Sequence, residues 1–149
     1  MQAESAEPET WIGQRVGNHR LVRVLGRGGM GMVFEAIHEG VQGRAAIKIL
    51  RPDVTSRADV TTRFFNEARA ANAVQHPGIV RIFDCGVTDS GVAYLSMEFL
   101  EGESLRARLG REHQLPVKIA LRIARQIASA LTAAHRVGIV HRDLLRCGK

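Results

Sequence analysis

The 149-residue sequence has only two cysteines, Cys85 and Cys147, which lie far apart and form no Cys-x-x-Cys spacing. It therefore indicates neither a disulfide framework nor a zinc site, and we expect a reducing, cytoplasmic setting. No apolar run approaches the length of about 18 residues that crosses a bilayer, so no membrane segment is expected. The first ten residues are polar and acidic, without a cationic start or an apolar stretch. They predict a flexible leader and not a secretory signal peptide.

Lysine and aromatic residues are also scarce. Aromatic residues make up 5% of the chain, and the lysines are Lys48, Lys118 and Lys149, although the formal net charge is +6. The arginines that supply this charge are scattered singly, without the basic runs and interleaved aromatic residues of single-strand binders, so no nucleic-acid partner is expected. The overall composition, 45% hydrophobic and 24% charged, is typical of a globular protein, and the length suits one ordinary domain.

Apolar periodicity and turn residues predict five strands, with one helix after the third strand. The strand-forming segments are residues 21–25, 32–37, 44–50, 79–87 and 92–99. An apolar period of 3.6 residues over 55–75 indicates the helix, and the same period over 117–137 indicates a second, amphipathic helix. Strands grouped ahead of helices favour an α+β fold with a five-stranded antiparallel sheet over an alternating parallel fold.

A glycine motif, Gly26-x-Gly28-x-x-Gly31, lies between the first two predicted strands. Dinucleotide-binding folds use the same spacing and an acidic residue about 20 positions later, where Asp53 lies, but they need a helix directly after the third glycine. Residues 32–37 are strand formers, so we predict a hairpin whose backbone amides approach phosphate groups closely. For the motif considered alone, a glycine-rich turn without a ligand is the alternative.

Ala46, Lys48 and Glu67 form a second candidate group. Ala46 and Lys48 are two residues apart on a predicted strand, so both side chains point to one face. Glu67 follows the apolar stripe of the predicted helix, together with Phe64 and Ala71, where a carboxylate needs a cationic partner. Lys48 alone is typical of a surface lysine, but the two residues together predict an ammonium group held by a carboxylate.

Two further segments gain significance only from their positions. Residues 97–100 (Met-Glu-Phe-Leu) end the fifth predicted strand, a pattern that is by itself typical of a buried strand end before a polar turn. Residues 141–143 (His-Arg-Asp) follow the second helix, and such a tripeptide is common enough to occur by chance. In this position its aspartate is a candidate proton acceptor, with the arginine as a fixed cation beside it.

In this order the motifs resemble the protein kinase superfamily. Residues 26–36 (GRGGMGMVFEA) and 76–80 (HPGIV) are similar in particular to bacterial serine/threonine kinases of the eukaryotic-like type, and the resemblance runs from about residue 18 to residue 144. It implies transfer of the γ-phosphoryl group of ATP to serine or threonine hydroxyls of a protein substrate. It also implies a kinase N-lobe with the ATP cleft over residues 11–100, after a leader of residues 1–10. Residues 101–149 would then form the hinge and the beginning of a C-lobe.

The resemblance assigns roles to individual residues. Lys48 would bind the α- and β-phosphates, and Glu67 would pair with it. Asp143 would accept the proton of the substrate hydroxyl beside Arg142, and Met97 would be the gatekeeper of the adenine pocket. The implied ATP contacts are Leu25, Gly26, Arg27, Gly28, Gly29, Met30, Gly31, Met32, Val33, Ala46, Lys48, Met97, Glu98 and Leu100.

The resemblance ends at Leu145. After its catalytic aspartate the family continues as Leu-Lys-Pro-x-Asn, whereas this sequence has Leu145 at the lysine position and Gly148 at the asparagine position. Mg²⁺ is expected for the family, but its ligands, this asparagine and the aspartate of a later Asp-Phe-Gly motif, are missing, so no metal site is predicted. We expect a truncated, inactive catalytic loop and an exposed apolar stripe on the 117–137 helix. The alternative function is a non-catalytic ATP-binding or regulatory remnant of a kinase.

Overall fold

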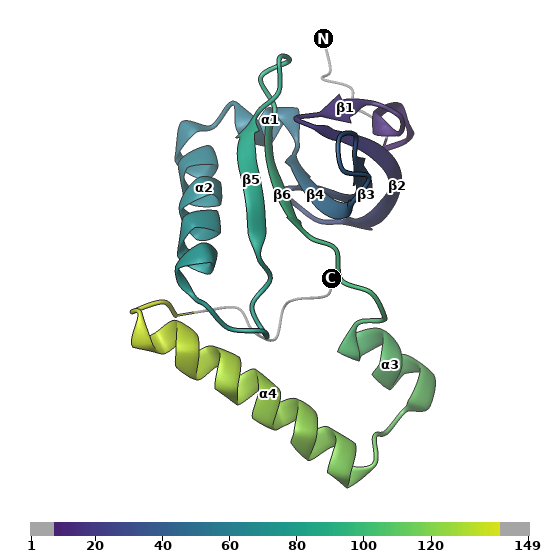
Figure 1. The fold of residues 1–149 in the computed structure, drawn as a ribbon, viewed down its shortest axis with the longest axis vertical. Coiled ribbons are helices and arrows are strands. Elements are labelled where there is room, and N and C mark those ends of the chain that lie inside the picture. The colour runs from purple at the N-terminus through teal and green to yellow at the C-terminus, as the bar shows by residue number, and fades with distance from the viewer. Residues whose placement is uncertain (1–7, 141–149) are drawn as a thin grey trace. The chain divides into compact units, whose positions relative to one another are not determined.

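An antiparallel sheet is the main element of the fold. In the computed structural model, which describes residues 8–140, six strands follow the spatial order β1-β2-β3-β4-β6-β5 (Figure 1). The strands are β1 Arg15–Val16, β2 His19–Arg27, β3 Gly31–His38, β4 Arg44–Leu50, β5 Ile82–Val87 and β6 Ala93–Glu98. The five predicted strands and the α+β class are confirmed. Strand β1 is additional, because two residues are too short to show an alternating pattern.

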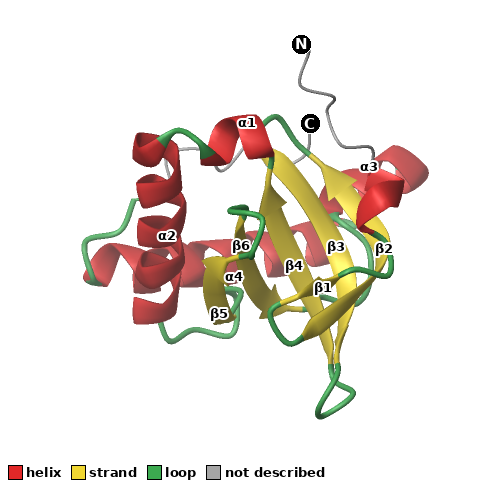
Figure 2. Cartoon of the chain, turned by 90° about the horizontal axis from the view of Figure 1, so that it is seen from above, coloured by secondary structure: helices red, strands yellow, loops and turns green. Residues whose placement is uncertain are grey.

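The helices precede, interrupt and follow the strands in the sequence. They are the 3₁₀ helix η1 Pro8–Trp11 and the α-helices α1 Pro52–Thr55, α2 Ala58–Ala73, α3 Leu105–Glu112 and α4 Val117–Arg136. Helix α2 stands beside the sheet (Figure 2). Helix α3 was missed by the sequence analysis, although Ser104 is its N-cap and accepts a hydrogen bond from the backbone nitrogen of Ala107 at 3.1 Å. Within residues 8–140, no helix combines the length and apolar character that a membrane span requires.

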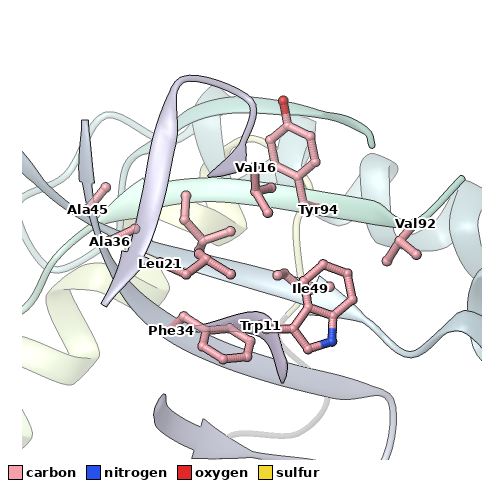
Figure 3. Packing of buried hydrophobic residues seen from close by; sticks show 10 residues of the cluster. Trp11, Val16, Leu21, Phe34, Ala36, Ala45, Ile49, Val92 and Tyr94 are labelled. Carbon is pink, nitrogen blue, oxygen red and sulfur yellow. The ribbon is translucent and has the colours of Figure 1, made fainter. Parts of the chain in front are cut away.

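The two faces of the sheet have different partners. Phe34 of β3 pairs with Ile47 of β4, and both are fully buried on one face. They belong to a core of ten residues: Trp11, Val16, Leu21, Phe34, Ala36, Ala45, Ile47, Ile49, Val92 and Tyr94 (Figure 3). Burial of each large apolar side chain in such a core contributes about 1.5–3 kcal/mol. A second cluster joins α2 to the sheet through Leu50, Phe64, Ala68, Ala93 and Leu95.

The chain divides into two compact units. Among the described residues, unit 1 consists of residues 8–72 and 81–99, and unit 2 of residues 73–80 and 100–140. The segment 73–80 therefore belongs to unit 2, although it lies between two stretches of unit 1 in the sequence. Two contacts within unit 2 explain this assignment, because His76 Nε2 lies 2.9 Å from Ser129 Oγ, and the backbone of Gly78 packs against Ala130.

Helix α4 uses its small residues for packing inside unit 2. Ala130 and Ala134 are buried, whereas Val117 and Leu121 are 74% and 66% exposed. Ile127 is also exposed. The expected exposure of the apolar stripe is therefore confirmed for Val117, Leu121 and Ile127, whereas Leu131 is half-buried and Ala134, at the end of the stripe, is buried.

The glycine motif forms a hairpin between β2 and β3, as predicted. Gly28 donates a backbone hydrogen bond to the carbonyl oxygen of Gly31 at 2.8 Å, and β3 begins directly at Gly31. A methyl group at Gly31 would lie 2.1 Å from the carbonyl oxygen of Ile49, whereas methyl groups at Gly26 or Gly29 would meet nothing within 4 Å. Gly31 is therefore needed for the close packing of β3 against β4, whereas Gly26 and Gly29 border open space.

Asn72 ties the end of α2 to the edge strand β5. Its side-chain oxygen accepts a hydrogen bond from the backbone nitrogen of Ile82 at 2.9 Å, and its side-chain nitrogen donates to the carbonyl oxygen of Ile82 at 2.9 Å. The amide thus satisfies both backbone groups of one residue, as a neighbouring strand would.

We expect alanine substitutions at Gly31 and Gly29 to differ in their effect on stability. Gly31→Ala should lower the free energy of unfolding by at least about 1–3 kcal/mol, because the new methyl group meets backbone that has to shift. Gly29→Ala should change it by less than about 0.5 kcal/mol. Urea denaturation of both variants provides the comparison, and equal midpoints would contradict the packing role of Gly31.

The Asn72 interaction predicts a second stability effect. Asn72→Ala removes two hydrogen bonds that are accessible to solvent, so the free energy of unfolding should fall by about 1–2 kcal/mol. The matched control is Asn66→Ala, because Asn66 lies on the same helix and its side-chain oxygen accepts a hydrogen bond from the side chain of Arg69, a residue of the same helix. An Asn72→Ala variant as stable in urea as this control would show that the two hydrogen bonds between Asn72 and Ile82 do not contribute to stability.

Candidate nucleotide-binding site

The predicted site residues of β3, β4 and β6 lie on one face of the sheet. Val33 pairs with Lys48, and Ala46 pairs with Met97. Directly opposed residues of antiparallel strands share a face, so these four side chains line the face opposite Phe34 and Ile47. We call Val33, Ala46, Lys48 and Met97 the site wall.

The glycine loop begins where the site wall ends. Gly31 pairs with Leu50, two residues beyond the partner of Val33, and Arg51 donates a backbone hydrogen bond to the carbonyl oxygen of Met30 at 3.0 Å. Leu25 and Met30 are exposed, and Arg27 is exposed as well. The open space at Gly26 and Gly29 gives the loop room for a ligand next to its backbone amides.

Lys48 and Glu67 do not meet. The ammonium nitrogen of Lys48 lies 5.5 Å from the centroid of the Phe64 ring, and Glu67 is exposed. Among residues 8–140, no ion pair joins Lys48 to Glu67. Helix α2 instead buries Phe64 and Ala68, which are one turn apart. Glu67 directly precedes Ala68, and neighbouring residues of a helix are rotated by about 100° around its axis, so Glu67 lies on a different side of α2. The structure therefore differs from the expectation that Glu67 faces the sheet. In the structure, Lys48 makes a cation–π contact with Phe64 and no ion pair with Glu67.

The remaining predicted site residues belong to the segment after β6 and to the end of the sequence. Met97 and Glu98 are half-buried at the end of β6, and Glu98 donates a backbone hydrogen bond to the carbonyl oxygen of Arg81 at 2.9 Å. Leu100 is exposed and belongs to unit 2. Arg142 and Asp143 lie outside the described residues.

The sequence analysis missed an acidic residue beside the site wall. Glu35 pairs with Ala46, and its carboxylate forms ion pairs with Arg23 at 2.6 Å and Arg44 at 2.9 Å. Burial would raise the pKa of Glu35, but the hydrogen bonds and positive charges of Arg44 and Arg23 outweigh burial and hold the pKa below its ordinary value. The period-two pattern of β3 contained the signal, since Val33 and Glu35 are two residues apart and share a face.

A cavity of about 370 Å³ lies elsewhere in unit 1, among residues that include His19, His38 and Asp84. It contains none of the site wall. Burial lowers the pKa of His19, and neighbouring His38 lowers it further, while Asp84 acts in the opposite direction. Within residues 8–140, no group of three or more histidine, cysteine, aspartate or glutamate side chains could hold a metal ion.

Comparisons with known proteins identify the family of the chain. Residues 19–145 match the family model of the protein kinase domain. The chain is 44% identical over 133 residues to the serine/threonine-protein kinase Pkn1 of Myxococcus xanthus, and this match covers 89% of the chain and 19% of Pkn1. It is 40% identical over 134 residues to the serine/threonine-protein kinase PrkC of Bacillus subtilis, covering 89% of the chain and 20% of PrkC.

Solved structures give the same result. The crystal structure of the Mycobacterium tuberculosis PknI kinase domain matches with a TM-score of 0.73 and 31% identity, covering 89% of this chain and 54% of that domain chain. The chain thus spans about half of the solved kinase domain and about a fifth of Pkn1 and PrkC. Because the family model of the protein kinase domain matches most of the chain, the chain belongs to the protein kinase family, and the relatives named here are bacterial serine/threonine-protein kinases.

Proposed function

We propose that this chain is the nucleotide-binding part of a serine/threonine protein kinase and that unit 1 binds ATP. The observation that carries the proposal is the strand register, which aligns Val33, Ala46 and Lys48 on one face at the base of the glycine loop. The open space at Gly26 and Gly29 fits a phosphate chain, because backbone amides can approach phosphate oxygens there. Family membership supports the same function.

The register also supports one direction for the nucleotide. Adenine would lie against Ala46 and its partner Met97, and the phosphates would lie toward Lys48 and the loop. Ala46 and Lys48 are two positions apart on β4. This spacing is about 6–7 Å along a strand and leaves room for the ribose. A small side chain at position 46 allows a flat base to approach the sheet, whereas the ammonium group supplies the charge that phosphates need.

Nucleotide binding would rearrange the contacts of Lys48. The ammonium group would leave the Phe64 ring for the phosphates, and α2 would turn so that Glu67 reaches Lys48. The contact given up joins a half-buried ammonium group to a buried ring, and such a cation–π interaction contributes about 0.5–2 kcal/mol.

The proposed reaction is phosphoryl transfer to serine or threonine hydroxyls of a cytoplasmic protein. Asp143 would accept the hydroxyl proton, with Arg142 as a neighbouring cation. Mg²⁺ would normally support such a transfer, but the residues present do not fit it, since Gly148 stands where the family has its metal-binding asparagine. We therefore assign no step to Mg²⁺ in this chain.

One observation favours a second function, namely nucleotide binding without transfer. Leu145 and Gly148 replace the lysine and asparagine that follow the catalytic aspartate in the family pattern. A chain with these two residues keeps the site wall and loses side chains that act on the transferred phosphate and its metal. For this chain as it stands, ATP binding without turnover is the function that we favour.

Lys48→Met should weaken ATP binding and leave adenosine binding unchanged. The substitution removes a charge that faces phosphates, and adenosine has none, so the dissociation constant for ATP should rise about tenfold, which is about 1.4 kcal/mol. Isothermal titration calorimetry with both ligands gives the two affinities. Lys118→Met is the control, because Lys118 is an exposed lysine of α4. Equal ATP affinities for the wild type and Lys48→Met would refute the assignment of Lys48.

Phosphoryl transfer by the purified chain should remain at background. Metal ions contribute several kcal/mol to such a reaction, so the loss of a protein ligand should reduce the rate on the order of 10³-fold or more. Radiolabelled ATP, Mg²⁺ and a generic basic protein provide the assay, with PrkC as a positive control. Asp143→Asn should give the same background as the wild type. Incorporation that disappears in Asp143→Asn would establish catalysis and exclude the binding-only function.

A further inference from the structure

The ion pairs of Glu35 connect three strands of unit 1. Glu35 of β3 has a side chain that is 9% exposed, and it binds Arg23 of β2 at 2.6 Å and Arg44 of β4 at 2.9 Å. A buried carboxylate has to be compensated by such partners, because its desolvation is costly. Each arginine uses its Nε atom on a different carboxylate oxygen, so both oxygens of Glu35 are held.

These residues lie at the adenine end of the site wall. Glu35 is directly opposite Ala46, and Ala46 is directly opposite Met97. Arg44 is two residues from Ala46 on the same strand, so its side chain leaves the sheet on the same face. Lys48, at the phosphate end, is two residues away in the other direction.

Arg44 also contacts the segment that follows β6. Its guanidinium carbon lies 3.9 Å from the centroid of the Phe99 ring, a distance at which the planar cation stacks on the aromatic face. Phe99 is the last residue of unit 1, and it follows Met97 and Glu98, which belong to the proposed ATP contacts. Because Glu35 holds the guanidinium group, the guanidinium group in turn restrains the ring.

We propose that Glu35, Arg44 and Phe99 are positioning residues that hold the segment 97–99 in place for adenine. This role rests on the proposed ATP-binding function. None of the three residues needs to touch the base. The carboxylate of Glu35 holds the guanidinium group of Arg44, and this group holds the ring of Phe99. The side chains of Arg23 and Arg44 are 58% and 43% exposed, and ion pairs with such exposed partners add little net stability, so the main effect of these pairs is on orientation. The low pKa of Glu35, caused by Arg44 and Arg23 in spite of burial, keeps the pair charged at neutral pH.

A double-mutant cycle on the full chain tests this role. Arg44→Ala and Phe99→Leu each break the same stack, so each should raise the dissociation constants for adenosine and for ATP by the same factor, about threefold to tenfold. The double variant should be no weaker than the single variants, because the second substitution removes nothing further. Titration calorimetry with adenosine and ATP gives all of these constants.

Two variants make the test specific. Arg44→Lys keeps a cation for Glu35 but lacks the planar group, so its adenosine affinity should lie between those of the wild type and Arg44→Ala. Arg57→Ala is the control. Arg57 is an exposed arginine that forms an ion pair with Asp59 at 3.6 Å and is not part of the site wall. The adenosine affinity of Arg57→Ala should equal that of the wild type. Phe99→Leu leaves the ion pairs intact, so it tests the stack even if Arg44→Ala does not fold.

The possible outcomes separate the positioning role from ATP binding itself. A wild-type chain that binds neither adenosine nor ATP would overturn the proposed function, and the positioning role with it. A wild-type chain that binds both, together with an Arg44→Ala or Phe99→Leu variant of unchanged adenosine affinity, would overturn the positioning role alone. Effects of Arg44→Ala and Phe99→Leu that multiply in the double variant would also overturn it, because independent residues behave in that way.

Discussion

The pairing of β3 with β4 is the interaction on which the rest of the structure depends. Its register puts Phe34 and Ile47 into the core and sends Val33 and Lys48 to the opposite face. A slip of one residue would exchange the two sets, because successive side chains of a strand point to opposite faces. The core would then receive an ammonium group and the site would receive a phenyl ring. Stability and the candidate site are therefore specified by one set of backbone hydrogen bonds.

The site face carries two charged groups whose surroundings differ. Glu35 is buried and held by two arginines, whereas the ammonium group of Lys48 lies 5.5 Å from the centroid of the Phe64 ring. A carboxylate whose two oxygens are each held by a guanidinium group is restrained more strongly than an ammonium group 5.5 Å from a ring centroid. The proposed adenine end of the site wall is thus held more firmly than the proposed phosphate end. Such a division suits a ligand whose base is flat and rigid and whose phosphates are flexible.

Periodicity predicted those features that depend on neighbours in the sequence. The alternation in β3 and β4 gave the shared face of Ala46 and Lys48, and strand formers after Gly31 gave the hairpin. The orientation of Glu67 was not predictable, because one apolar stripe allows several rotations of a helix, and the observed one depends on how Phe64 packs. The Glu35 ion pairs were missed for a similar reason, since they join residues of three strands that only the register brings together.

The segment 73–80 has a practical consequence for dissecting the protein. It interrupts unit 1 in the sequence but belongs to unit 2, where His76 contacts Ser129 and Gly78 packs against Ala130. Cutting the chain after residue 99 would therefore not isolate unit 1. The shortened polypeptide would still carry half of an interface whose other half, on α4, had been removed. A clean separation of the two units requires replacing residues 73–80 with a short polar link between Asn72 and Arg81, so that the amide of Asn72 can still reach Ile82.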